Sequence, residues 1–488
     1  MLRKTLKITA LGVGALIVVG VALYLFFGLR VVLDGGGTPH LRLVDSPEQQ
    51  AERIRRHREE QRATVPSVVS GASVETRAVE PVLPARPSDP PARPVIASDR
   101  PAAYWTDFRG PRRDGEYLEG PLLTKWPSNG LKPMWKQPAG GGYASFAVAG
   151  GRAFTIEQRG REEVVVAYDV ATGRELWTNT WTAEFREALG GDGPRATPTW
   201  ADGLVYALGA TGELRALDEA TGRVRWRANI LQDSGATNLS WGMAAAPLIV
   251  DDAVIVLPGG PNGQSVAAYD RRTGVRRWSA LGDQQAYSSP MLVTVNGVRQ
   301  ILVFSATRLM GLAFDGGKLL WEYPWVGYNG INAAQPLMLG NNRIFLSSSY
   351  GLGAAVIELS SGAGGFSVHE VWRNNRMKNR FASSVLHDGI IYGLDESILA
   401  AVDAGTGELK WKGGRYGYGQ LLLADGHLIV LTEDGDLALV RARPDRYEEL
   451  ARFPVLEGKT WNVPALAGGY LLVRNLAEMA AFDLRVPR

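Results

Sequence analysis

The sequence predicts an all-β protein: an eight-bladed β-propeller of four-stranded blades, with seven blades as the alternative. Three observations point to this fold. One eleven-residue phrase, apolar-x-Asp-x-x-Thr-Gly-x-x-x-Trp, recurs at intervals of roughly 45 to 52 residues, which is typical of propeller blades. Two further segments of alternating apolar residues precede each copy, as expected for strands. The 58 glycines and 27 prolines supply the turns that many short strands require.

The repeated phrase predicts a hairpin that joins neighbouring blades. Its Asp can cap the turn, its Gly supplies the positive φ of a tight turn, and its Trp lies on the next strand, directed toward the adjacent blade. Large aromatic residues at a constant repeat position are mostly core residues. The predicted structural positions, including those from one shortened and one degenerate copy, are Asp169, Gly173, Trp177, Asp218, Gly222, Trp226, Asp270, Gly274, Trp278, Trp321, Trp372, Asp403, Gly407 and Trp411.

The number of blades depends on how the two ends of the repeat array meet. Seven complete units end near residues 180, 230, 280, 324, 373, 412 and 454. An eighth unit begins at Trp461 but stops before its Trp strand. The segment LKPMWKQP around Trp135 is predicted to supply that strand and to close the ring without a covalent bond. Closure removes an open sheet edge, which would otherwise invite aggregation.

The N-terminal region predicts a membrane anchor. Residues 8–29 form a run of 22 residues without a charge, and about 20 apolar residues span a bilayer. Arg3, Lys4 and Lys7 precede the run, so residues 1–7 are expected to stay in the cytoplasm. The predicted location is therefore the bacterial cytoplasmic membrane, crossed once, with the propeller on the periplasmic side. A cleaved signal peptide is the alternative.

Residues 34–103 are predicted to be a linker between the membrane and a propeller over residues 104–488. A helix is expected to begin at Ser46-Pro47-Glu48-Gln49, with Ser46 as its cap. Its charges cover nearly every face, so we expect it to be solvated. The following segment is rich in proline and poor in large apolar side chains, which is typical of a stiff spacer. This spacer would lift the propeller away from the membrane.

Composition excludes several classes of site. The chain has no cysteine, which excludes disulfides, thiolate zinc sites, a cysteine nucleophile and a lipid anchor on cysteine. The net charge of +3 does not predict a nucleic-acid-binding surface.

The phrase resembles the PQQ-like repeat of a propeller family that includes quinoprotein dehydrogenases and BamB, a subunit of the outer-membrane barrel assembly machinery. The resemblance covers Trp135 to Leu484. The leader WTDFRGPRRDG (105–115) also resembles the entry segment of a bacterial group of such propellers. The resemblance implies either a BamB-like, non-catalytic module that binds envelope proteins through its loop faces, or a PQQ-dependent oxidoreductase resembling alcohol and sugar dehydrogenases. We favour the binding module, because the fold alone does not argue for catalysis, and we assign no catalytic residue.

The resemblance places any cofactor in the propeller channel, which the inner strands and their entry loops line. No cofactor is expected, but PQQ with calcium is possible there. Asp192, Asp233 and Asp283 could together hold Ca²⁺, which prefers oxygen ligands, or could simply cap turns. The candidate cofactor-binding residues are Arg195, Trp241, Gln285, Tyr287, Asn332, Arg380, Gln420 and Trp461, and Gln335 and Asn462 are further channel residues.

Overall fold

The computed structural model describes residues 28–63 and 104–486. The predicted anchor, apart from its last two residues, and the Pro-rich segment lie outside these ranges. Within them, no helix is long and apolar enough to cross a membrane. Leu29, the last residue of the predicted anchor, begins a strand rather than ending a helix.

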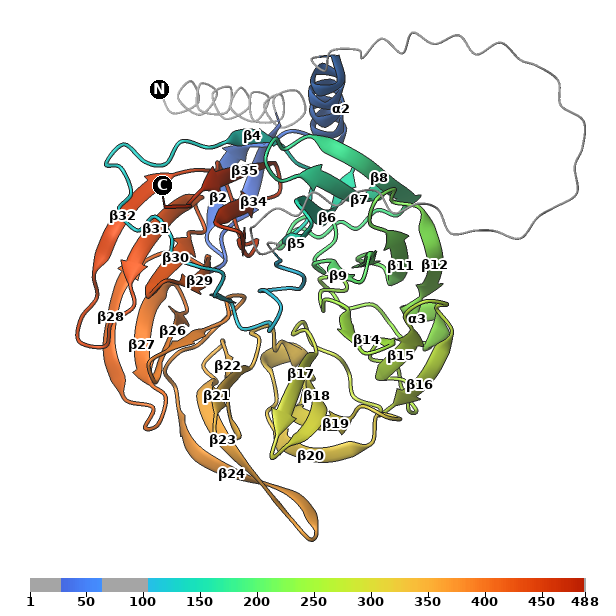
Figure 1. The fold of residues 1–488 in the computed structure, drawn as a ribbon, viewed down its shortest axis with the longest axis vertical. Coiled ribbons are helices and arrows are strands. Elements are labelled where there is room, and N and C mark those ends of the chain that lie inside the picture. The colour runs from blue at the N-terminus through green and yellow to red at the C-terminus, as the bar shows by residue number, and fades with distance from the viewer. Residues whose placement is uncertain (1–27, 64–103, 487–488) are drawn as a thin grey trace, which may run out of the picture.

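Eight sheets are arranged around a central axis as the blades of a propeller (Figure 1). Blade 1 contains β5 (Ala147–Ala149), β6 (Arg152–Arg159), β7 (Glu162–Asp169) and β8 (Glu175–Thr182), and blade 2 contains β9 (Thr199–Ala201), β10 (Leu204–Leu208), β11 (Glu213–Asp218) and β12 (Val224–Asn229). Blade 3 contains β13 (Leu248–Val250), β14 (Ala253–Val256), β15 (Val266–Asp270) and β16 (Arg276–Ala280), and blade 4 contains β17 (Met291–Val295), β18 (Val298–Phe304), β19 (Arg308–Ala313) and β20 (Leu319–Pro324). Blade 5 contains β21 (Leu337–Gly340), β22 (Arg343–Ser348), β23 (Gly353–Gly362) and β24 (Gly365–Asn374). Blade 6 contains β25 (Val385–His387), β26 (Ile390–Asp395), β27 (Ile398–Asp403) and β28 (Leu409–Arg415). Blade 7 contains β29 (Gln420–Ala424), β30 (His427–Leu431), β31 (Asp436–Arg441) and β32 (Glu449–Pro454).

Blade 8 joins the two ends of the array. It contains β33 (Ala465–Ala467), β34 (Tyr470–Arg474) and β35 (Glu478–Asp483), and its outer strand is β4 (Trp135–Pro138) from the other end of the array. Trp135 pairs with Ala481 in antiparallel register. The prediction of eight four-stranded blades is therefore confirmed, and the N-terminal strand closes the ring. An additional short strand, β3 (Glu116–Tyr117), which the sequence analysis did not anticipate, pairs in parallel with inner strand β29 of blade 7.

The repeated phrase forms a contact between neighbouring blades. Gly222 has φ +69°, and a Cβ atom built on it would lie 2.5 Å from Cε3 of Trp177 in the preceding blade. The Trp177 indole Nε1 also donates to the carbonyl of Glu219 in the same turn, at 2.9 Å. The same Trp-on-Gly contact joins four other pairs: Trp135 and Gly173, Trp226 and Gly274, Trp278 and Gly317, and Trp372 and Gly407. Each turn thus needs glycine both for its backbone and for the space that a neighbouring ring fills. Trp321 differs, because its indole donates to Gln300 within its own blade.

A hairpin and a helix precede the propeller and pack against it. The hairpin consists of β1 (Leu29–Leu33) and β2 (Pro39–Leu43), and the helix is α2 (Pro47–Ala63). Ser46 caps α2 as predicted: the Gln49 amide donates to its hydroxyl at 3.2 Å, and the Gln49 side chain accepts from the Ser46 amide at 2.8 Å. The expectation that this helix is solvated is wrong, because Ile54 and Arg58 are buried. Two short helices, α3 (Ile230–Asp233) and the 3-10 turn η1 (Tyr328–Gly330), lie in loops between blades.

Candidate functional site

The leader crosses the middle of the propeller, where Figure 1 shows it in cyan. Arg113 donates to the carbonyls of Ala246 at 3.2 Å, Pro247 at 2.5 Å and Pro290 at 2.8 Å, at the entry of blades 3 and 4. Its charge is paired with Asp107 at 2.9 Å. These contacts make Arg113 a bridge from the leader to two blades.

Arg109 makes the corresponding contacts on the other side of the channel. It donates to the carbonyls of Ser384 at 2.9 Å and Leu421 at 3.4 Å, in blades 6 and 7. Both leader arginines are buried, and burial lowers the pKa of Arg109 to about 10. The resemblance identified this leader, but nothing in its sequence indicated that it would tie opposite sides of the ring together.

A cavity of about 250 Å³ lies in the channel. Phe108 of the leader lines it on one side, and residues 33–37 at the tip of the β1–β2 hairpin line it on another. The structure brings six of the eight candidate cofactor-binding residues together around it: Arg195, Trp241, Tyr287, Arg380, Gln420 and Trp461.

Aromatic side chains form part of the cavity walls. Trp461 stacks on Tyr143 with a centroid distance of 5.3 Å and contacts Phe381 at 4.7 Å. Trp241 and Tyr287 form a second pair at 5.8 Å. Both candidate tryptophans, Trp241 and Trp461, are therefore packed against other aromatic rings in the cavity wall.

Two arginines add positive charge to these walls. Arg380 lies 4.6 Å from the Tyr350 ring centroid, and Arg195 lies 4.6 Å from that of Phe185. Arg195 also donates to the Gly191 carbonyl at 2.5 Å, and burial lowers its pKa. The cavity therefore offers cationic and aromatic surface.

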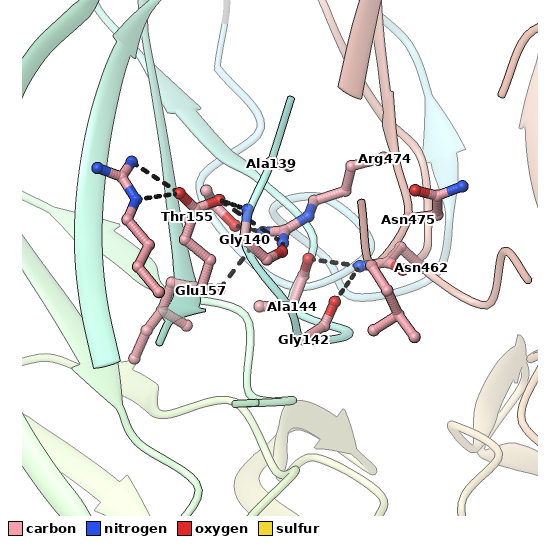
Figure 2. A network of polar contacts seen from close by, with 12 residues as sticks. Ala139, Gly140, Gly142, Ala144, Thr155, Glu157, Asn462, Arg474 and Asn475 are labelled. Carbon is pink, nitrogen blue, oxygen red and sulfur yellow. Dashed lines mark hydrogen bonds and ion pairs between the residues drawn. The ribbon is translucent and has the colours of Figure 1, made fainter. Parts of the chain in front are cut away.

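The other four predicted channel residues do not line the cavity, and their side chains donate hydrogen bonds to backbone carbonyls. Asn332 donates to the Ser305 carbonyl at 2.8 Å, and Gln285 donates to that of Pro258 at 3.3 Å. Gln335 donates to the Ser289 carbonyl at 2.7 Å, which links blades 5 and 4. Asn462 donates to the carbonyls of Gly142 and Ala144 at 3.1 and 3.0 Å, which links blades 8 and 1 (Figure 2). The sequence placed these amides near the axis but did not distinguish blade-linking residues from cavity walls.

The three aspartates considered for calcium do not form a ligand set. Asp283 receives two hydrogen bonds from Arg308, at 2.7 and 2.6 Å, and Asp233 accepts one from the Tyr269 hydroxyl at 2.9 Å. Burial raises the pKa of Asp192. Across residues 28–63 and 104–486, no three His, Cys, Asp or Glu side chains come together in a way that could hold a metal ion. The three aspartates therefore do not form the calcium site that was considered for them.

A polar network joins blades 8 and 1 at the closing seam (Figure 2). Arg474 donates to the Gly140 carbonyl at 2.8 Å and to the Thr155 hydroxyl at 2.7 Å. Its guanidinium lies 3.8 Å from Glu157, with both side chains fully buried. Glu157 in turn accepts from the Gly140 amide at 3.0 Å.

Helix α2 lies over the same seam. Arg58 donates to Gln137 at 2.9 Å and to the Tyr168 hydroxyl at 3.2 Å, which belong to blades 8 and 1. Gln50 donates to the carbonyls of Ala139, at 2.8 Å, and Leu476. The sequence analysis predicted the strand that closes this seam but not these polar contacts, because their residues are far apart along the chain.

Comparison with known proteins agrees with the architecture. A family model described as outer membrane protein assembly factor BamB matches residues 124–240 and 161–413. The protein of that name from Burkholderia pseudomallei (strain K96243) is 23% identical over 382 residues, covering 68% of this chain and 93% of that protein. The one from Bordetella pertussis (strain Tohama I) is 23% identical over 313 residues, covering 61% and 72%. The crystal structure of BamB from Moraxella catarrhalis superposes with a TM-score of 0.52 at 14% identity, covering 73% of this chain and 99% of that one, a similarity of fold alone.

Proposed function

Because the chain belongs to the family of the outer membrane protein assembly factor BamB, we propose that it is a non-catalytic binding module of the bacterial envelope. In this proposal residues 8–29 cross the cytoplasmic membrane once, and the propeller lies on the outer side. Its partners are envelope proteins, and the name of its relatives makes the proteins that assemble the outer membrane the first candidates. They would bind the loop faces of the propeller.

The observation that carries this proposal is that the chain itself crosses and lines the channel, which leaves a cavity of about 250 Å³. The leader crosses the channel, and the hairpin tip lies in the cavity wall. Among the described cavity-lining residues Asp34 is the only carboxylate, and no histidine takes part. General acid–base catalysis needs positioned titratable groups that reach the substrate, and this cavity supplies few. The outer loops remain as the surface available for binding.

The proposal includes no resident quinone or calcium ion. It is tested by calorimetry on the purified full chain, titrated with pyrroloquinoline quinone in the presence and absence of Ca²⁺. We expect no saturable heat and no rise in melting temperature. Saturable binding at micromolar or lower concentration would favour the oxidoreductase instead.

The binding function is tested in cells with a photo-crosslinking residue on each face of the propeller. Val326 lies in the loop between blades 4 and 5, and the comparably exposed Val275 lies in a turn within blade 3. We expect an ultraviolet-dependent crosslink to an outer-membrane assembly protein from one position and not the other. Deletion of the gene should also lower the amount of folded outer-membrane barrel protein. Absence of both effects would contradict the proposal.

A further inference from the structure

The β1–β2 hairpin carries an apolar face that nothing in the described structure covers. Its register places Leu29 opposite Leu43 and Val31 opposite Leu41, so these side chains share one face. The exposed fractions are 71% for Leu41, 70% for Leu43 and 63% for Val31, and Val44 beside them is also exposed. Contiguous exposed apolar side chains commonly mark a surface that binds protein or membrane.

The opposite face of the hairpin is turned toward the propeller. Val32, His40 and Arg42 line a groove with residues of blades 6 and 7, and Arg42 lies 3.5 Å from Asp434. At the tip, the Gly35 amide donates to Glu433 at 2.5 Å. A Cβ atom on Gly35 would collide with the Tyr418 ring, so the tip is closely seated. The hairpin is therefore part of the propeller body, with its apolar face outward.

The position of this face along the chain indicates what covers it. The uncharged run of residues 8–29 ends at the first residue of β1. Leu43 lies directly across from Leu29, and paired residues in a sheet are about 5 Å apart. Val31 is two residues further, or about 7 Å along the strand. The headgroup layer on each side of a bilayer is roughly 5–8 Å thick. A hairpin that begins where a membrane span ends therefore places these side chains in that layer.

The Pro-rich segment does not separate the propeller from this point. It lies between α2, which is held on the closing seam by Gln50 and Arg58, and the leader, whose Trp105 is buried and paired with Val148 of blade 1. Both of its ends are therefore attached to the propeller. These attachments therefore give no support to the prediction that this segment holds the propeller away from the membrane.

We propose that the exposed face formed by Val31, Leu41 and Leu43 inserts into the lipid headgroup layer and seats the propeller directly on the membrane. This inference rests on the proposed membrane attachment through residues 8–29. It adds that the body lies against the lipid surface rather than at the end of an extended linker. The partner is the lipid interface itself, recognised by apolar burial.

The test uses the full chain in vesicles of equal parts phosphatidylcholine and phosphatidylglycerol. The chain has no native cysteine, so Leu41→Cys, Leu43→Cys and Val275→Cys each give one labelling site. Val275, at 65% exposure, is the matched control on blade 3. A polarity-sensitive fluorophore at each site is quenched with brominated phosphatidylcholine. We expect quenching at residues 41 and 43 to be several times that at residue 275.

The outcomes separate the two proposals. If the chain floats with the vesicles but residues 41 and 43 are quenched no more than residue 275, the attachment holds and the inference is overturned. If the chain does not float, the membrane attachment fails and the inference fails with it. Leu41→Asp combined with Leu43→Asp should lower quenching of a label at Val31→Cys to the control level. Its melting temperature should not change, because both leucines are exposed.

Discussion

Replacing Gly222 by alanine tests the contact that links the blades. Gly222 and Gly203 both lie in turns of blade 2 with positive φ, +69° and +79°. Alanine in this backbone region costs about 1–2 kcal/mol at either position. A Cβ atom at Gly203 would meet nothing within 4 Å, whereas one at Gly222 would lie 2.5 Å from the Trp177 ring. Displacing that ring adds about 1–3 kcal/mol of overpacking and about 1 kcal/mol for its hydrogen bond to Glu219.

We therefore expect Gly203→Ala to lower the free energy of unfolding by about 1–2 kcal/mol and Gly222→Ala by about 3–6 kcal/mol. Urea unfolding followed by far-ultraviolet circular dichroism measures both. Trp177→Ala in the Gly222→Ala background should give a combined loss smaller than the sum of the single losses, because the added methyl group then has space. Equal losses for the two glycine variants, or additive losses in the double variant, would refute the Trp-on-Gly contact.

Three further predictions concern other inter-blade contacts. Burial raises the pKa of Glu163 to about 7 from its usual 4.5, so the stabilisation linked to its protonation is complete below pH 4.5 and is lost as the pH rises through 7. Glu163→Gln should therefore raise the free energy of unfolding at pH 8 by up to about 3 kcal/mol and change it little at pH 4.5. Urea unfolding at the two pH values measures this difference. Arg58→Ala should cost about 1–3 kcal/mol, because it removes the buried hydrogen bonds from α2 to Gln137 and Tyr168. Arg55→Ala, whose partners Glu52 and Glu59 lie on the exposed side of the same helix, should cost less than about 0.5 kcal/mol. Urea unfolding measures both. Trp135→Ala should speed limited proteolysis near the N-terminal strand more than Trp372→Ala does, because Trp135, unlike Trp372, lies on the strand that closes the ring. Comparable cleavage rates would contradict this.

The blade count and the closing strand could be predicted because both are periodic properties of the chain. The phrase recurs once per blade, and the segment around Trp135 supplied the one Trp strand that the last repeat lacked. The role of that Trp is the same at the seam as elsewhere: its indole donates to the Val170 carbonyl at 2.8 Å, as Trp177 does to Glu219. Because the Trp and the turn that it contacts both recur once per blade, the spacing of the phrase is enough to predict this contact between blades.

The docking of α2 could not be predicted in this way. Its sequence is charged on nearly every face and has one buried aliphatic side chain, Ile54. Its burial depends on Arg58 meeting Gln137 and Glu175, which lie 79 and 117 residues away. The cavity was predictable only in part: Arg195 and Arg380 were expected to line the channel, but their contacts with the Phe185 and Tyr350 rings were not. Such contacts do not recur once per blade, so the repeat spacing cannot predict them.

The N-terminal segment, made of the β1–β2 hairpin and α2, is coupled to the closure of the ring. A ring closed without a covalent bond depends on the pairing of β4 with β35, whose residues are more than 300 positions apart along the chain, so the entropy of closing that loop opposes it. Gln50 bonds both the Ala139 carbonyl, just beyond β4, and the Leu476 carbonyl, just before β35. Arg58 holds β4 against blade 1. The helix that follows the proposed lipid-binding hairpin therefore contacts both strands of the seam, and its docking is coupled to closure of the ring.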